Sequence, residues 1–246
     1  MFQFFVNQEQ VGKEYVTIVG SDVNHISNVL RMKIGEKIRV STSAGQDYFC
    51  SIAEIGPDFV QADILDEEAP NTELPSKIYL FQALPKGDRM ETIIEKAVEL
   101  GVYEIIPVAM KFCVVKLDDK KAANKIRRWQ AIAEAAAKQS KRSLIPQIHD
   151  VMTYKEALAY ARECEVNLVP YENERGMVAT KEALDGIAPG QSVSIMIGPE
   201  GGFAPEEIDA AREDMQVISL GKRILRTDTA AICTMSMVMS TLEMKL

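Results

Sequence analysis

Strand-like and helix-like segments alternate from residue 77 to the end of the chain, and this alternation limits the fold more than any other feature. Short apolar runs predict strands at residues 77–84, 104–108, 147–149, 166–169, 193–197 and 217–220. Apolar residues at helical spacing predict helices at residues 88–100, 119–140, 177–184 and 227–244, and two more that begin at Thr153 and Pro205. Such alternation is typical of a mainly parallel sheet covered by helices. We therefore predict an α/β domain over residues 75–246.

Two of these helices carry start signals. Asp88 with Glu91, and Thr153 with Glu156, have the spacing of a capping box, in which each side chain bonds the backbone of the other residue. Gly101 is expected to end the first of the two helices.

The first 65 residues have a different pattern, with several short strands. Strands are predicted at residues 3–6, 14–19, 37–42, 47–55 and 59–65, with turns at 43–46 and 56–58 and one short helix from Ser21 or Asp22. So many short strands are typical of a closed sheet, so we predict a small β-barrel over residues 1–70. The acidic segment at 66–75 contains two prolines and no apolar period, so we interpret it as a linker.

Composition indicates an ordinary globular protein and excludes several classes. No apolar run approaches the ~20 residues that cross a bilayer, and the first residues lack a basic, then apolar, leader. We therefore expect a cytoplasmic protein without a membrane partner. The four cysteines are far apart and contain no C-x-x-C pair, which favours buried free thiols and indicates no metal site.

Positive charge is concentrated in two segments, although the net charge is −8. Residues 116–142 hold nine Lys or Arg against three acids, so this window is +6 and the rest of the chain is −14. A smaller excess lies at residues 31–39. Each cluster alone is typical of a solvated face, but two clusters in an acidic protein favour a polyanionic partner.

Two glycine-containing loops near the end of the chain are the best candidates for a ligand site. Residues 198–203 follow one buried strand and residues 220–231 follow the next. Because ligands bind at the carboxyl ends of strands in open α/β sheets, we expect these loops to lie side by side there. Neither loop has the G-x-G-x-x-G or the G-K-[ST] pattern, so a nucleoside triphosphate site is not expected.

These loops resemble those of a known family. Residues 197–203 (IGPEGGF), Leu220, Gly221 and residues 226–231 (RTDTAA) are similar to the bacterial small-subunit ribosomal RNA methyltransferases that modify N3 of a uracil, within the SPOUT superfamily. Further similarity lies at residues 24–33 (NHISNVLRMK), 85–91 (PKGDRME), 96–101 (KAVELG) and 134–142 (EAAAKQSKR). The chain departs from the family pattern at Asp228, where many members have Glu, and at Ser27, where a basic residue is common.

The resemblance implies a PUA-like RNA-binding barrel over residues 1–70 and a SPOUT domain with a deep trefoil knot over residues 75–246. It implies S-adenosylmethionine as cofactor, 16S ribosomal RNA of the small subunit as partner, and a homodimer formed in part by the methionine-rich last helix. The cofactor-binding residues that it implies are Leu168, Val169, Pro170, Ile197, Gly198, Glu200, Gly201, Gly202, Leu220, Gly221, Ile224, Leu225 and Arg226.

Methylation of a uracil N3 requires removal of a proton while negative charge spreads to the ring oxygens. We assign Arg226 to stabilise that charge, and Asp228 or Glu200 to act as the base. A salt bridge between Arg226 and Asp228, or an N-cap role for Asp228, explains these residues almost as well. Basic residues expected to grip RNA from two sides are His25, Arg31, Lys33, Lys37, Lys86, Arg89, Lys138, Lys141 and Arg142.

Two other functions remain open at this point. A related SPOUT enzyme that acts on transfer RNA or on a ribose 2′-oxygen would have the same cofactor loops. A non-catalytic RNA-binding assembly factor would need only the basic clusters.

Overall fold

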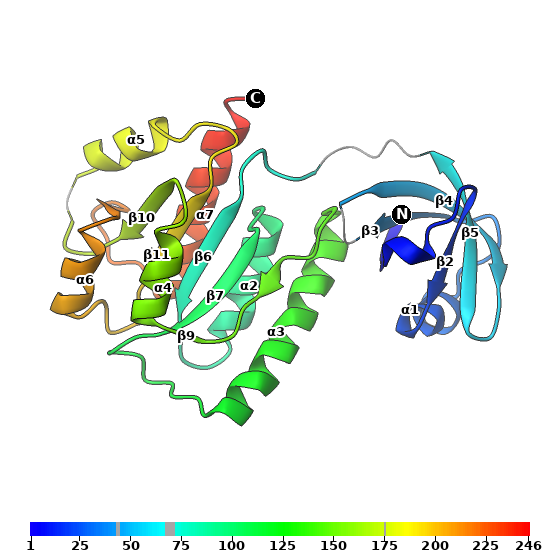
Figure 1. Cartoon of the computed structure of the whole chain (residues 1–246), viewed down its shortest axis with the longest axis horizontal. Coiled ribbons are helices and arrows are strands. Elements are labelled where there is room, and N and C mark those ends of the chain that lie inside the picture. Colours follow the sequence, from blue (N-terminus) through cyan, green and yellow to red (C-terminus); the bar gives the residue numbers. More distant parts are fainter. Residues whose placement is uncertain (43–44, 67–71, 175) are drawn as a thin grey trace. The chain divides into compact units, whose positions relative to one another are not determined.

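A computed structural model describes residues 1–42, 45–66, 72–174 and 176–246 (Figure 1). The chain divides into two compact units. Unit 1 contains Met1–Glu73 and Ala137–Ile145, and unit 2 contains Leu74–Ala136 and Pro146–Leu246. Ala137–Ile145 thus groups with the amino-terminal residues, which the bounds 1–70 and 75–246 did not anticipate. Part of the predicted turn at 43–46 and half of the predicted linker, at 67–71, lie outside the described residues.

Unit 1 is built on a curled five-stranded sheet. Its strands are β1 (Phe2–Val6), β2 (Tyr15–Val19), β3 (Lys37–Thr42), β4 (Asp47–Ile55) and β5 (Phe59–Asp66), in the order β1-β3-β4-β5-β2. Only β1 and β3 pair in parallel. The short elements η1 (Gln8–Gln10), α1 (Ser21–Asn24) and η2 (His25–Val29), a π-helical turn that continues α1, complete the unit.

The sheet of unit 1 is a half-barrel, where the sequence predicted a closed barrel. Its end strands β1 and β2 do not pair with each other in the described ladder. Val23 and Ile26 of the α1–η2 segment, together with Met32, belong to the same buried cluster as the strand residues. The segment therefore completes the apolar core of the unit.

A buried polar network fixes Ala137–Ile145 within unit 1. Arg39 forms an ion pair with Asp47, and Ser41 and Ser143 donate hydrogen bonds to the same carboxylate. Gln3 donates to the Arg142 carbonyl at 2.6 Å and to the Ser41 hydroxyl at 2.8 Å.

Unit 2 contains a seven-stranded parallel sheet. Its strands are β6 (Ile78–Ala83), β7 (Glu104–Ala109), β8 (Gln147–Ile148), β9 (Met152–Thr153), β10 (Val166–Pro170), β11 (Val193–Ile197) and β12 (Gln216–Ile218). The order is β12-β10-β11-β6-β7-β8, with β9 also paired to β7, and every ladder is parallel. The predicted parallel α/β sheet is confirmed.

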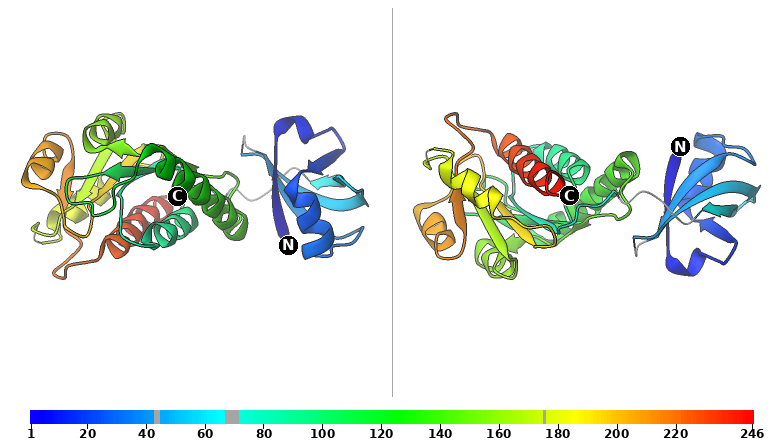
Figure 2. Two further views of the ribbon diagram at one scale, coloured as in Figure 1. Left: turned by 90° about the horizontal axis from the view of Figure 1, so that it is seen from below. Right: turned by 90° about the horizontal axis from the view of Figure 1, so that it is seen from above.

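Six helices of the described chain accompany this sheet, namely α2 (Arg89–Glu99), α3 (Asp119–Ser140), α4 (Tyr154–Ala161), α5 (Val178–Asp185), α6 (Pro205–Ala211) and α7 (Thr227–Glu243). Figure 2 shows α2 and α7 packed side by side on one face and α4 on the other. The buried face of α2 consists of Met90, Ile93, Ile94, Ala97 and Val98, as its periodicity predicted. Among the described residues, no helix is long and apolar enough to cross a membrane.

One of the two predicted capping boxes is confirmed and the other is wrong. In α4, the Glu156 amide donates to the Thr153 hydroxyl and the Thr153 amide donates to the Glu156 carboxylate. In α2, the Asp88 side chain does not cap the helix, because its backbone (φ −98°, ψ 10°) lies outside the extended region that an N-cap residue adopts. Glu91 accepts a hydrogen bond from Arg128 instead.

The predicted free thiols are confirmed for all four cysteines. Cys50, Cys113 and Cys164 are buried and Cys233 is half-buried. Burial and the nearby Asp63 raise the pKa of Cys50 to about 12, so this thiol stays protonated.

We predict that Asp47→Asn destabilises unit 1 strongly. The substitution removes the Asp47 charge from beside the buried Arg39 guanidinium, and breaking a buried pair in this way typically costs about 3–5 kcal/mol. Urea unfolding followed by circular dichroism measures the effect, with the exposed loop variant Lys13→Ala as control, expected within about 0.5 kcal/mol of wild type. A similar small loss for Asp47→Asn would show that the pair contributes little.

Candidate functional site

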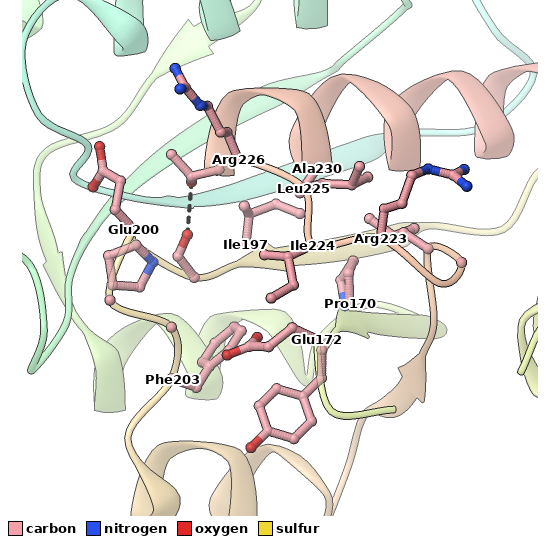
Figure 3. A pocket seen from close by; sticks show the side chains of 18 of the residues that line it. Pro170, Glu172, Ile197, Glu200, Phe203, Arg223, Ile224, Leu225, Arg226 and Ala230 are labelled. Atoms are coloured by element: carbon pink, nitrogen blue, oxygen red, sulfur yellow. Dashed lines mark hydrogen bonds between the residues drawn. The ribbon is translucent and has the colours of Figure 1, made fainter. Parts of the chain in front are cut away.

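A cavity of about 420 Å³ opens at the carboxyl edge of the unit 2 sheet. Its walls come from three segments, namely residues 170–172 after β10, residues 197–203 after β11, and residues 220–230, which lead into α7. Figure 3 shows the apolar side chains of Ile197, Ile224 and Pro170 facing the interior. The volume lies within the range of small-molecule sites, about 300–1,000 Å³.

The strand order corrects one detail of the prediction. The two loops were expected to follow neighbouring strands, but β10 lies between β11 and β12. The end of β10 therefore adds Pro170, Tyr171 and Glu172 to the cavity, between the two loops that the sequence singled out.

The glycines of the first loop permit close packing around it. A Cβ atom on Gly198 would approach the Phe203 ring to 2.9 Å, and one on Gly201 would approach the Phe112 Cβ to 2.9 Å. Gly202 has a φ of +73°, and a Cβ there would lie 2.5 Å from a carboxylate oxygen of Glu172. Larger residues would displace these neighbours, so the shape of the loop requires glycine for its own packing as well as for any ligand.

The Thr227 hydroxyl ties the first loop to the start of α7. It donates to the Gly198 carbonyl at 2.8 Å and accepts from the Gln82 amide nitrogen, on β6, at 3.0 Å. The second loop is held at its other end by the buried Thr180 of α5. The Thr180 hydroxyl donates to the Ser219 carbonyl and accepts from the Ser219 amide. Both loops of the cavity are thus fixed by buried threonines.

Glu200 is engaged by the loop before α2. Its carboxylate accepts the Lys86 amide at 3.0 Å and forms an ion pair with Arg89. Burial raises the pKa of Glu200, but these hydrogen bonds and the Arg89 charge outweigh burial and hold the pKa below its usual value. Glu200 is therefore ionised at neutral pH and binds a proton weakly.

Arg226 and Asp228 lie at the start of α7. Arg226 occupies the N-cap position, and its exposed side chain makes no cap bond. Within the described part of the chain no ion pair joins it to Asp228, and Asp228 is not the N-cap residue. One carboxylate oxygen of Asp228, Oδ1, is buried and has no hydrogen-bond partner among the described residues.

Most of the predicted cofactor residues come together around this cavity. Those that line it are Pro170, Ile197, Gly198, Glu200, Gly201, Gly202, Leu220, Gly221, Ile224, Leu225 and Arg226. Leu168 and Val169 do not belong to the lining, because both are fully buried inside β10. The sequence analysis missed Tyr171, Glu172, Pro199, Phe203, Lys222, Arg223, Thr227 and Ala230. Continuing past the end of each predicted strand, rather than stopping at it, would have found Tyr171 and Glu172.

The predicted RNA-binding residues fall into both units. Lys86 and Arg89 belong to unit 2 and His25, Arg31, Lys33, Lys37, Lys138, Lys141 and Arg142 to unit 1. In unit 1 the first four are exposed. Arg31 (φ 52°) and Lys141 (φ 63°) have a left-handed backbone, which is uncommon outside glycine.

Two basic residues of unit 1 are held by acidic partners. The Lys138 ammonium lies 3.2 Å from an Asp22 carboxylate oxygen. Arg142 is only 3% exposed and forms an ion pair with Glu73, which also accepts the Ser143 amide at 2.8 Å. These contacts give Arg142 a structural role in unit 1.

The described residues form no cluster of metal-ligating side chains. No group of three or more His, Cys, Asp or Glu side chains is placed there to hold an ion. The expectation that no metal takes part stays a prediction.

Known proteins resemble this chain along its whole length. Residues 72–239 match the family described as RNA methyltransferase domain, and residues 18–65 match the family described as RNA methyltransferase PUA domain. The ribosomal RNA small subunit methyltransferase E of Bacillus subtilis is 38% identical over 226 residues, which cover 90% of this chain and 88% of that protein. The protein of the same name from Mesomycoplasma hyopneumoniae is 34% identical, with 94% and 96% covered.

Solved structures agree with these matches. The ribosomal RNA small subunit methyltransferase E of Neisseria gonorrhoeae, bound to S-adenosyl methionine, has a TM-score of 0.84 and 32% identity, and 98% of this chain and 97% of that chain are covered. A methyltransferase of Legionella pneumophila in complex with the cofactor SAM also has a TM-score of 0.84, with 30% identity and 97% of each chain covered.

The cavity at the sheet edge and the PUA-like unit together define an RNA methyltransferase. Within this class, the chain belongs to the family of the ribosomal RNA small subunit methyltransferases E to which it is similar.

We predict that Thr227→Val destabilises unit 2 by about 1–3 kcal/mol, the typical cost of leaving a buried polar group unpaired. Valine has nearly the shape of threonine, but it can neither donate to the Gly198 carbonyl nor accept from Gln82. Trp129 is the single tryptophan and is buried in unit 2, so its fluorescence during urea unfolding measures the change. Thr227→Ser keeps the hydroxyl and is the matched control. Equal stability of the Val and Ser variants would refute the role of this hydroxyl.

Proposed function

We propose that this protein transfers a methyl group from S-adenosylmethionine to N3 of one specific uridine in the 16S ribosomal RNA of the small subunit. The observation that carries the proposal is the cavity formed by the loops after β10, β11 and β12, whose lining includes most of the residues that the family resemblance implies for the cofactor. The two similar structures that contain the cofactor support it.

The residues of the cavity fit this cofactor in size and chemistry. Ile197, Leu220, Ile224 and Leu225 offer apolar surface for the adenine ring, and the glycine-rich backbone offers hydrogen-bonding groups. Arg223 supplies a positive charge for a carboxylate, and Glu172 supplies an acceptor for hydroxyl or ammonium groups. When bound, the cofactor supplies an activated methyl group on its sulfonium.

The protein itself contributes to the reaction by orienting the acceptor base and by stabilising the negative charge that develops on it. Transfer to a ring nitrogen is an in-line displacement, so a rigid pocket that orients the acceptor supplies much of the rate. The threonine-anchored loops meet that requirement. Arg226 lines the cavity, is exposed, and forms no ion pair among the described residues. We assign its guanidinium to stabilise negative charge on the uracil oxygens.

Asp228 is the better of the two candidates for the base. Glu200 binds a proton weakly, because its hydrogen bonds lower its pKa, and its carboxylate is already committed to Arg89 and Lys86. Asp228 lies in the first turn of α7, two residues from Arg226, and its buried Oδ1 has no hydrogen-bond partner among the described residues. We therefore assign proton removal to Asp228 and the positioning of Arg89 to Glu200.

RNA binding is assigned to exposed and half-buried basic residues of both units. His25, Arg31, Lys33 and Lys37 on the PUA-like unit, residues 1–70, and Lys86 and Arg89 on residues 75–246 would contact phosphates. Lys138 and Lys141 would join them, whereas the burial of Arg142 argues against a phosphate contact there.

The remaining features of the proposal come from the family resemblance. They are a deep trefoil knot in the SPOUT domain, a homodimer and a cytoplasmic location. The half-buried Ile232, Met237 and Met239 on α7 support a dimer, because they leave apolar surface for a second subunit.

Methylation of small subunits and of naked 16S RNA with labelled S-adenosylmethionine tests this function. N3 methylation blocks base pairing, so primer extension is expected to stop at one uridine, whereas ribose methylation leaves pairing intact. Label on transfer RNA alone would favour a related SPOUT activity. No transfer to any RNA would leave only the assembly-factor function.

We predict that Asp228→Asn lowers kcat about 100-fold or more, because general-base catalysis typically contributes at least that factor. Affinity for S-adenosylmethionine, measured by titration calorimetry, is expected to stay within about two-fold of wild type. Asp209→Asn, on the exposed face of α6 and outside the cavity lining, is the control. Normal turnover of Asp228→Asn together with a large loss in Glu200→Gln would exchange the roles of the two carboxylates.

A further inference from the structure

One exposed aromatic side chain lies directly against the cofactor loop, and the function proposed above does not use it. Phe112 lies in the segment between β7 and α3, and 42% of its surface is exposed. A Cβ on Gly201 would lie 2.9 Å from the Phe112 Cβ, 3.6 Å from its Cγ and 3.4 Å from its carbonyl oxygen. Since Gly201 lines the cavity, Phe112 packs against a residue of the cavity wall.

The backbone on both sides of Phe112 is anchored. The Lys111 amide donates to the buried Glu207 carboxylate at 2.8 Å, and that carboxylate also accepts the Ala204 amide at 2.8 Å. On the other side, Cys113 is buried and its amide donates to the Met110 carbonyl at 3.1 Å. Phe112 is therefore exposed at a fixed position and not at a mobile loop tip.

The surroundings of Phe112 suit a nucleic acid. The Lys86 backbone amide and the Arg89 guanidinium contact Glu200, the residue before Gly201, so both basic residues belong to a segment that packs on this loop, although Glu200 offsets the charge of Arg89. The Lys111 ammonium lies 5.9 Å from the centre of the Phe112 ring, although an ion pair with Glu206 offsets its charge.

A methyltransferase that acts on N3 must take the target base out of its pair, because N3 lies on the pairing edge. The extruded base loses its stacking neighbours, and proteins commonly replace them with an aromatic ring. Such a ring must be exposed before RNA binds, be fixed in place, and lie beside the methyl donor. Phe112 is exposed, anchored and in contact with a glycine of the cofactor loop.

We propose that Phe112 is the stacking platform for a nucleobase of the RNA substrate next to the cofactor loop. This inference rests on the proposed function for the identity of the RNA. Its chemical content, a flat base stacked on the ring, does not depend on which nucleotide is methylated. Phe112 is thus a positioning residue for the substrate.

The test compares Phe112→Ala with Phe112→Tyr, which keeps the ring, and with Val114→Ala, a matched loss of exposed apolar surface in the same segment. Phe112→Ala is expected to raise the KM for RNA about ten-fold or more, the range expected for one stacked base. Affinity for S-adenosylmethionine, from titration calorimetry, should stay within about two-fold. Phe112→Tyr and Val114→Ala should behave like wild type.

A second measurement separates failure of this inference from failure of the proposed function. In Phe112→Trp, the new indole is expected to lose fluorescence when single-stranded oligouridylate is added, whereas the buried Trp129 of wild type is expected to be unaffected. Quenching without methyl transfer by wild type would support the platform and refute the proposed function.

Three results would overturn the inference. The first is an unchanged KM for RNA in Phe112→Ala. The second is an equal loss of cofactor affinity, which would show that Phe112 only supports Gly201. The third is dissociation of a wild-type dimer into monomers in Phe112→Ala, which would mean that a second subunit covers the ring.

Discussion

The cavity of this protein depends on one buried hydroxyl group. Thr227 donates to the Gly198 carbonyl and accepts from Gln82, so a single side chain joins β6, the loop after β11 and the first turn of α7. These segments are far apart in the sequence, and only the parallel sheet brings them to one edge. The same contact sets where α7 begins, and hence where Arg226 and Asp228 lie. The Thr227 hydrogen bonds therefore hold one wall of the cavity and the segment that carries Arg226 and Asp228.

Near the cavity and in unit 1, ion pairs determine which charged side chains remain available to bind a substrate. Glu200 is bound to Arg89 and to the Lys86 amide, so its carboxylate orients the neighbouring loop. Among the described residues, one buried oxygen of Asp228 has no hydrogen-bond partner, and Arg226 is exposed. In unit 1, Arg142 is committed to Glu73 while Arg31 and Lys33 remain exposed. Side chains that form ion pairs within the protein thus stabilise its structure, whereas the exposed ones can bind a substrate.

Local sequence patterns predicted the elements better than their arrangement. The buried face of α2 follows from its periodicity. Thr153 caps α4 because its capping partner, Glu156, lies only three residues away. The position of β10 between β11 and β12, and hence Tyr171 and Glu172 in the cavity, depends on long-range pairing that no local pattern encodes. The burial of Arg142 and the contact of Phe112 with Gly201 are likewise long-range. Asp88 does not cap α2 with its side chain, because its backbone angles lie outside the extended region.

The central claim is that this pocket directs a methyl group to a uracil nitrogen. Its most direct test is mass spectrometry of the nucleosides released from small-subunit RNA after incubation with the protein and S-adenosylmethionine. We expect one new nucleoside, 3-methyluridine, at up to one molecule per subunit. A ribose-methylated nucleoside, a methylated base other than uracil, or no new nucleoside would contradict the claim.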